Sequence, residues 1–408
     1  MLQFSRITLP LAAVNFLNQG TRALLATIAP VLAFEFDLSA SGLGFLAASF
    51  FAAYALAQLP IGIALDLFGA RKVQRVLVLV AAAGFALSAV AENTAVLGVS
   101  RFIAGAGVGA GLMAMLKAHS QWYPRERVAA VTGAGIFVAG FGGMVATVPA
   151  QAMLPYLGWR GIFWLLAGLG VLVSIWISVS VPEPPAHIIR PQRRRLTQEI
   201  AEFGRIFTDR PFLRLLPAVA VLSAVNFTYQ GLWAGPWLRD VAGLADGPRA
   251  TVLLCYALGM MIGSLATGQA SSFAQARWGS PMAVPFLGIA GSMAMQALLI
   301  SAPQDLVALG AIWFCFSFFG SVTPAAYAAM GQGFPPELAG RVATAINGSM
   351  LVLVFLLQNV IGWILDFWPR TDSGGWDPAG YGWAVGMTLA MQVGATAWIA
   401  IARPGRRG

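Results

Sequence analysis

The chain has 408 residues, of which 58% are hydrophobic and only 10% are charged. Soluble domains carry about 25% charged residues, so this composition excludes an ordinary water-soluble enzyme. The formal net charge of +9 would suggest nucleic acid as a partner in a soluble protein. Here the positions of the basic residues along the chain give another explanation of the positive net charge. The sequence contains no HExxH, GxSxG or GxxxxGK[ST] motif, so we expect neither an enzyme nor a cofactor.

Long apolar stretches dominate the chain from its start. About 20 consecutive apolar residues are enough for a helix to cross a bilayer. The apolar windows and the polar breaks between them predict an all-α membrane protein with twelve transmembrane helices. These lie at residues 7–34, 41–64, 73–91, 97–121, 128–153, 159–181, 213–238, 250–272, 281–301, 305–330, 341–364 and 380–402.

The basic residues are distributed unevenly over the loops. An even number of spans places both termini on one side, and if that side is the cytoplasm the inner segments hold 18 basic residues. The outer loops then hold four: Arg160, Arg239, Arg249 and Arg370. Because cytoplasmic loops are enriched in Lys and Arg, this asymmetry predicts cytoplasmic termini in a plasma (bacterial inner) membrane. The positive charge would then contact anionic lipid headgroups, and no nucleic acid is expected as a partner.

Residues 182–212 form the longest polar stretch. Within it Leu196, Ile200, Phe203 and Phe207 recur at helical spacing, which fits a short amphipathic helix at the inner membrane surface. A solvated linker is the other interpretation. Either way, we expect a six-helix half at 1–181, a cytoplasmic linker at 182–212 and a second six-helix half at 213–408.

An internal repeat relates the two halves. The segment Ala13–Ala23 reads AVNFLNQGTRA, and the segment 211 residues later, Ala224–Ala234, reads AVNFTYQGLWA. The same offset carries Tyr123-Pro-Arg-Glu onto Phe334-Pro-Pro-Glu. Two parallel six-helix halves related by an axis along the membrane normal are the architecture of a rocker-type secondary transporter.

The loop between the second and third expected spans carries a recognisable motif. It contains Gly62, then Asp66 four residues later, then Gly69 and the basic pair Arg71 and Lys72. We expect Gly62 to allow close helix approach and Gly69 a tight turn. Asp66 would accept from a facing helix N-terminus or pair with an arginine, as a latch that breaks when the halves rock.

This loop resembles the signature loop of the major facilitator superfamily. The fourth span begins with Arg101 followed by glycines at 105, 107, 109 and 111, which is similar to the second signature of that superfamily. The resemblance covers essentially the whole chain and implies a transporter that works by alternating access. It implies a gating or structural role for the motif loop and for Arg101, and it names no substrate.

Arg22 falls near the middle of the first expected span, where a charge is costly and therefore suggests function. Its segment resembles the first span of organic-anion and organophosphate members of the superfamily, which place a substrate-binding arginine there. Thr21 stands where sugar-acid symporters have an aspartate, and Trp233 stands where phosphate-ester exchangers have a second arginine. The missing arginine disfavours a doubly charged phosphate ester as substrate, and the missing aspartate disfavours proton symport of the sugar-acid type. The other interpretation of Arg22 is a packing residue bonded to backbone carbonyls.

Other polar residues complete the expected binding site. The first and seventh spans line the cavity in this superfamily, so the resemblance implies that they supply the lining residues. These are Asn18, Gln19, Asn226, Tyr229, Gln230 and Trp233. Lys117 is a further candidate, as an anion contact or inner-gate residue, or as a lysine that reaches the headgroups. Every Asp and Glu falls in a loop or at a span edge, which disfavours an intramembrane proton relay and favours an antiporter or uniporter.

We therefore expect a monomeric transporter of a small organic anion, a carboxylate. One alternative is an importer of copper(I) or another soft metal, since Cys255, Met260 and Met261 offer sulfur ligands in the eighth span. The superfamily members that transport copper carry paired Met and His motifs that are missing here. A further alternative is a membrane sensor or assembly factor that transports nothing.

Overall fold

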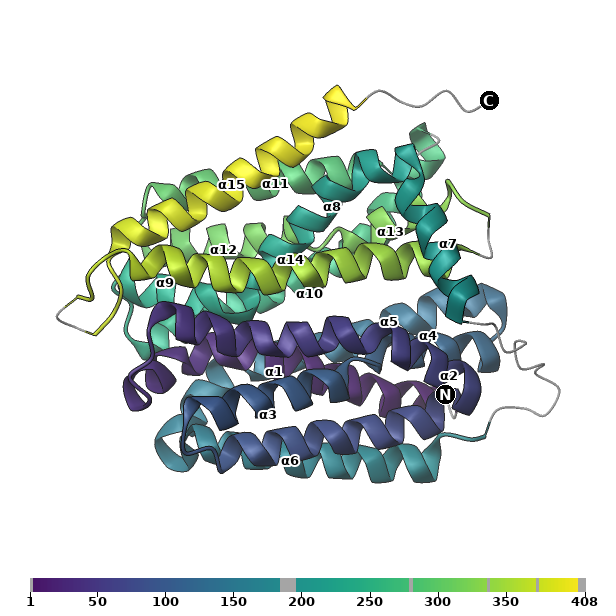
Figure 1. Cartoon of the computed structure of the whole chain (residues 1–408), viewed down its shortest axis with the longest axis horizontal. Coiled ribbons are helices and arrows are strands. Elements are labelled where there is room, and N and C mark those ends of the chain that lie inside the picture. The colour runs from purple at the N-terminus through teal and green to yellow at the C-terminus, as the bar shows by residue number, and fades with distance from the viewer. Residues whose placement is uncertain (1–2, 184–195, 279–281, 336–337, 372–373, 403–408) are drawn as a thin grey trace. The chain divides into compact units, whose positions relative to one another are not determined.

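The computed structural model describes residues 3–183, 196–278, 282–335, 338–371 and 374–402. The chain folds into two compact units, Met1–Arg193 and Arg194–Gly408 (Figure 1). Within the described ranges both units are helical, apart from one isolated antiparallel bridge between Arg370 and Trp376. The division between the units falls inside the polar stretch 182–212.

Unit 1 contains the first six expected spans. Its helices are η1 (Phe4–Thr8), α1 (Leu9–Glu35), α2 (Ala40–Ala89), α3 (Thr94–Val108), α4 (Gly111–Trp122), α5 (Arg125–Val145) and α6 (Val148–Ser180). Helix α2 covers the second and third spans, because Gly69 at φ 79° turns the chain between them. Helix α6 is broken in the same way at Gly158, with φ 60°. Its first turns therefore continue the fifth span, and the rest is the sixth.

Unit 2 contains the linker helix and the last six spans. Its helices are α7 (Leu196–Thr208), α8 (Arg210–Thr228), η2 (Tyr229–Trp233), α9 (Ala234–Asp240), α10 (Asp246–Trp278), α11 (Ala283–Ile300), α12 (Leu306–Gly320), α13 (Thr323–Gly331), α14 (Ala339–Asp366) and α15 (Pro378–Ile401). The seventh span thus runs through α8, the π-helical turn η2 and α9. The tenth span is interrupted between α12 and α13.

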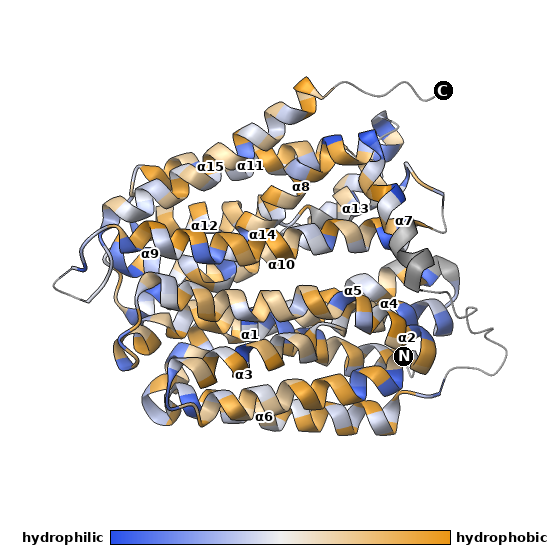
Figure 2. Cartoon of the chain, in the orientation of Figure 1, coloured by the Kyte–Doolittle hydropathy of each residue, from blue (hydrophilic) through white to orange (hydrophobic). Residues whose placement is uncertain are grey.

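The apolar character of the helices matches the expected spans. Among the described residues, nine helical stretches are long and apolar enough to cross a membrane, and Ala40–Ala89 holds two expected spans. The first expected span is α1, and α5 contributes a shorter apolar helix at Ala130–Val145. Figure 2 shows apolar residues along α6 and α15, with hydrophilic residues gathered at helix ends and turns. The prediction of an all-helical fold with many spans is confirmed.

Acidic and polar residues outside the apolar stretches begin several helices. The side chain of Asn93 accepts from the backbone N–H of Val96 at 2.9 Å, and Asp209 accepts from Phe212 at 2.8 Å. Asp305 accepts from the N–H of Ala308 at 2.7 Å. Such caps satisfy amide groups that the first helical turn leaves unpaired. This explains part of the placement of carboxylates at span edges.

Close contacts between helix backbones hold unit 1 together. Helix α2 packs on both α3 and α6, and α1 packs on α5 (Figure 1). A Cβ atom added to Gly142 of α5 would lie 2.0 Å from the carbonyl oxygen of Phe16 on α1. Between α3 and α2, a Cβ on Gly105 would lie 2.2 Å from the carbonyl oxygen of Phe50. Only glycine permits these approaches, as in other tightly packed membrane helices.

The linker helix α7 packs on other helices of unit 2. Ile206 is fully buried in a cluster with Phe212 and Val342, and Phe203 packs against the same cluster. Glu202 forms an ion pair with Arg341 of α14 at 2.7 Å. The helix expected in this segment is therefore present, but Phe207 is exposed and Ile206 takes the buried position. The side chains of Leu196 and Ile200 and the basic residues Arg193–Arg195 lie outside the described part of the chain.

Candidate functional site

Arg22 lies on α1, with its side chain buried inside unit 1 and only 5% of the residue exposed. Its Nη1 atom donates to Oε1 of Gln19 at 3.2 Å, because residues three apart share one face of an α-helix. The guanidinium also lies over the rings of Phe51 and Tyr54 on α2, at 5.6 and 5.8 Å from the ring centroids. These contacts orient the guanidinium group.

Polar atoms next to Arg22 along α1 are buried as well. Oδ1 of Asn18 and Oγ1 of Thr21 have no hydrogen-bond partner among the described residues. The backbone oxygen of Thr21 accepts from Nη1 of Arg101 at 3.4 Å, and the Arg101 guanidinium lies 4.9 Å from the ring centroid of Phe50. Arg101 therefore ties α3 to α1 and α2. This geometry fits the structural role expected for Arg101.

The motif loop forms an ion pair that the sequence did not identify. Asp66 at the end of the second span pairs with Lys117 of α4, where we had expected an arginine or a helix N-terminus. Arg71 donates to Glu183 at 3.2 Å, and Lys72 is exposed. Lys117, a candidate substrate ligand, is therefore engaged with Asp66 in this structure.

One expectation for this loop is wrong. A Cβ atom added to Gly62 would meet no atom within 4 Å in the described structure, so no helix approaches closely there. Gly69, in contrast, adopts the positive φ that a tight turn requires.

The seventh span places its candidate residues in unit 2. Asn226 accepts from the Tyr256 hydroxyl at 2.6 Å, through both its side-chain and backbone oxygens. Tyr229 packs in a group of aromatic rings, 5.6 Å from both Trp313 and Phe316 between centroids. Gln230 and Trp233 are buried in the π-helical turn η2. Asn226 is thus held by hydrogen bonds and Tyr229 by ring packing. Oε1 of Gln230 and Nε1 of Trp233 are buried without hydrogen-bond partners among the described residues.

The residues of the soft-metal alternative all lie on α10. Met260 is buried, whereas Cys255 and Met261 are half-buried. Among the described residues there is no group of three or more His, Cys, Asp and Glu side chains that could hold a metal ion.

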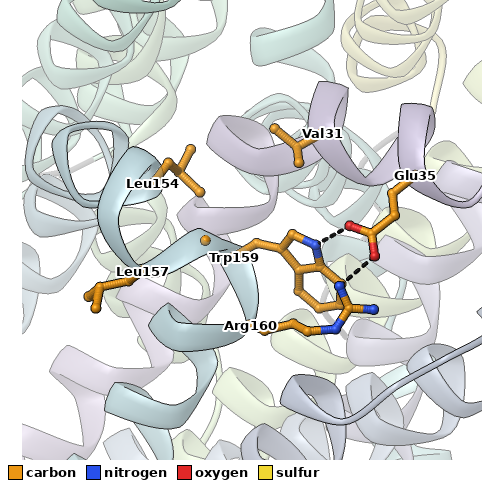
Figure 3. Close-up of a pocket in the computed structure, with 7 residues that line it drawn as sticks. Val31, Glu35, Leu154, Leu157, Trp159 and Arg160 are labelled. Carbon is orange, nitrogen blue, oxygen red and sulfur yellow. Dashed lines mark hydrogen bonds and ion pairs between the residues drawn. The ribbon is translucent and has the colours of Figure 1, made fainter.

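A polar cluster at one end of unit 1 was not anticipated. Glu35, the last residue of α1, accepts from the indole N–H of Trp159 at 2.6 Å and pairs with Arg160 (Figure 3). These residues line a pocket of about 410 Å³ together with Val31, Leu154 and Leu157. Burial alone would raise the pKa of Glu35, but the hydrogen bonds from Trp159 and Arg160 and the charge of Arg160 outweigh it and lower that pKa. The opposite charges of Glu35 and Arg160 in neighbouring outer loops were the only signal in the sequence.

Comparison with known proteins places the chain in a family. The profile described as Major Facilitator Superfamily matches residues 11–358. A probable sulfoacetate transporter from Cupriavidus necator is 24% identical over 354 residues, covering 82% of this chain and 80% of that protein. A gentisate transporter from Corynebacterium glutamicum is 30% identical over 288 residues, covering 69% of this chain and 63% of that protein.

Solved structures support the fold. A bacterial homologue of the human lysosomal transporter Spinster, in an inward-facing and occupied conformation, superimposes with a TM-score of 0.76 at 17% identity. The superposition covers 97% of this chain and 96% of that one, and it shows the fold alone. The resemblance indicated by the motif loop is confirmed.

Proposed function

This chain belongs to the major facilitator superfamily, an integral membrane family of secondary transporters, and on that premise we propose that it carries a small organic anion, a carboxylate. Two relatives support this substrate class, because the substrates in their names, sulfoacetate and gentisate, are organic acids. They resemble this chain at 24% and 30% identity, so they support the chemical class and leave the individual substrate open.

The buried guanidinium of Arg22 is the observation that carries the proposal. A planar guanidinium can donate two parallel hydrogen bonds to a carboxylate, a geometry that a lysine cannot reproduce. Gln19 and the rings of Phe51 and Tyr54 fix its orientation before a ligand arrives. A preoriented donor loses little side-chain entropy on binding, which favours affinity.

The positions of the carboxylates support exchange or downhill transport over proton symport. Asp209 and Asp305 cap helices, Asp66 pairs with Lys117, and Glu35 pairs with Arg160. All of these lie at helix ends, and the sequence has no Asp or Glu in the middle of a span. No expected span therefore offers a carboxylate in its middle that could carry a coupling proton.

The ion pair of Asp66 and Lys117 fits a latch that opens and closes during that cycle. It joins the loop after the second span to the fourth span within unit 1. Exposed ion pairs contribute little stability, roughly 0–1 kcal/mol, so such a contact can break without a large barrier. The basic asymmetry of the loops supports a cytoplasmic location for this end of the unit and for both termini.

A ligand screen followed by transport tests the proposal. Purified protein is heated in the presence of carboxylates, phosphate esters, sugars and Cu(I), since a ligand that binds only the folded state raises the melting temperature. We expect stabilisation by carboxylates, and uptake of the same compounds into proteoliposomes. Stabilisation by sugars or Cu(I) alone would contradict the anion proposal, and binding without uptake would favour a sensor.

A further inference from the structure

The repeat that relates the two units differs at the position of Arg22. Gln19 and Arg22 correspond to Gln230 and Trp233 at the offset of 211 residues. In unit 1 the two residues lie on a regular α-helix and bond to each other at 3.2 Å. In unit 2 they lie in the π-helical turn η2, which rotates successive side chains differently, and no such bond forms. π-Helical turns inside α-helices frequently occur at functional sites.

A second tryptophan packs against Trp233. Trp376, which precedes α15, lies with its ring centroid 6.4 Å from that of Trp233 at an interplanar angle of 72°. The two residues are 0% and 2% exposed, and the indole Nε1 of each has no hydrogen-bond partner among the described residues. Native proteins rarely leave a buried N–H donor without a partner, because its desolvation is not compensated. Two such donors on rings that pack together indicate a site for a hydrogen-bond acceptor.

Asp240, at the end of α9, holds Trp376 in place. Its Oδ2 atom accepts from the backbone N–H of Trp376 at 3.1 Å and from the hydroxyl of Tyr381 at 2.7 Å. Arg239 pairs with the same carboxylate and lies over the Trp376 ring, 5.5 Å from its centroid. A Cβ added to Gly375 would be 2.3 Å from Oδ1 of Asp240, so this backbone contact requires glycine. The position of Trp376 is therefore fixed by four groups around one buried carboxylate.

We propose that the indole N–H groups of Trp233 and Trp376 form a neutral subsite that binds a hydrogen-bond acceptor on the transported molecule, and that Asp240 is its positioning residue. This inference rests on the proposed function and narrows it. The substrate class is an organic anion that carries, besides its carboxylate, a second polar group such as a carbonyl, a sulfonate or another carboxylate. Neutral donors suit such a group because they add no second buried charge to compensate.

Two probe compounds test the subsite. They are 4-oxopentanoate and pentanoate, five-carbon monocarboxylates of equal charge that differ in one ketone oxygen. Calorimetric titration of the full-length protein should show tighter binding of 4-oxopentanoate. Trp376→Phe keeps an aromatic ring and removes the indole N–H. It should therefore weaken binding of 4-oxopentanoate about five- to tenfold, which corresponds to the loss of one hydrogen bond, and leave the binding of pentanoate unchanged. Trp383→Phe, at an exposed position on α15, is the matched control and should change neither.

The positioning of Trp376 by Asp240 is tested separately. Asp240→Asn should reduce the preference for 4-oxopentanoate as Trp376→Phe does, and Gly375→Ala provides a second route if Asp240→Asn does not fold. With indole ¹⁵N-labelled tryptophan, 4-oxopentanoate should shift the N–H resonance that disappears in Trp376→Phe.

The outcomes separate the two proposals. Equal binding of both compounds by the wild type, or equal weakening of both by Trp376→Phe, would overturn the subsite while leaving the role of Arg22 intact. Unchanged binding of both compounds in Arg22→Gln would instead overturn the anion proposal, whatever the tryptophan variants show.

Discussion

Replacement of Arg22 by Gln or Lys measures what the guanidinium contributes. A charge-assisted hydrogen bond contributes about 1.5–3 kcal/mol, and a bidentate carboxylate receives two of them. Part of this gain in binding free energy is offset by the cost of desolvating the substrate carboxylate. We therefore expect Arg22→Gln to weaken carboxylate binding by about 2–4 kcal/mol, which corresponds to roughly 30- to 1,000-fold in Kd. Arg22→Lys keeps the charge but loses the planar fork, so it should recover only part of the affinity.

Folding should survive both replacements. The contacts that Arg22 makes with Gln19, Phe51 and Tyr54 are one neutral-acceptor hydrogen bond and two cation–π contacts, each worth about 1 kcal/mol. Arg22→Gln also removes the desolvation penalty of a buried charge, which offsets that loss, and Arg22→Lys keeps a cation over the two rings. The melting temperature without ligand should therefore change little, so a loss of binding reports on the ligand contact and not on unfolding.

Calorimetric titration and proteoliposome uptake, with the carboxylate that stabilises the wild type most, are the assays. Arg75→Gln is the matched control, because Arg75 is an exposed arginine of the same unit. The reasoning is refuted if Arg22→Gln binds and transports like the wild type. It is also refuted if Arg22→Lys equals the wild type, because then only the charge matters and the fork geometry does not.

Three further predictions follow from unit 1. Asp66→Asn should leave the Kd for substrate unchanged and slow uptake severalfold, because Asp66 pairs with Lys117 at the end of the second expected span and not in its middle. A large rise in Kd in a folded variant would contradict the latch. Gly142→Ala should lower the free energy of unfolding by about 1–3 kcal/mol, since its Cβ would meet the carbonyl of Phe16, whereas Gly168→Ala, with open space around it, should not; equal effects in thermal melts would contradict the packing argument. Glu35 has a lowered pKa, so its stabilising contribution is present above about pH 4.5 and is lost as the pH falls through the lowered value. The difference in melting temperature between wild type and Glu35→Gln should therefore shrink on acidification below pH 4.5. A difference that grows would refute the predicted direction of this pH dependence.

Hydropathy and the repeat were sufficient to predict the spans and the two halves. Apolar runs report directly on which segments can lie in a bilayer. The family resemblance added an expected role for the motif loop, which stays a prediction. These are local properties of sequence, so a single chain is enough to read them.

The contacts that could not be predicted join residues far apart in sequence. Asp66 and Lys117 are separated by 51 positions, and Asp240 and Trp376 by 136. Which side chains meet across such distances depends on the rotation and tilt of packed helices, and periodicity leaves both undetermined. The π-helical turn at Tyr229–Trp233 could not be predicted for a related reason. The segment corresponds in the repeat to residues 18–22 of unit 1, which are α-helical, so the repeat gives no sign of a π-helical turn.

The backbone contacts at Gly105 and Gly142 bear on how a new cargo could be selected in the laboratory. Both glycines hold helices of one unit against each other, so any side chain there would force the helices apart regardless of what is transported. Gln230 and Trp233 are buried as well, but they lie in a turn that is already irregular and each already carries a side chain. Mutant libraries concentrated on these two positions should therefore yield more folded variants with altered preference than libraries that include the two glycines, which should mostly yield protein that never reaches the membrane.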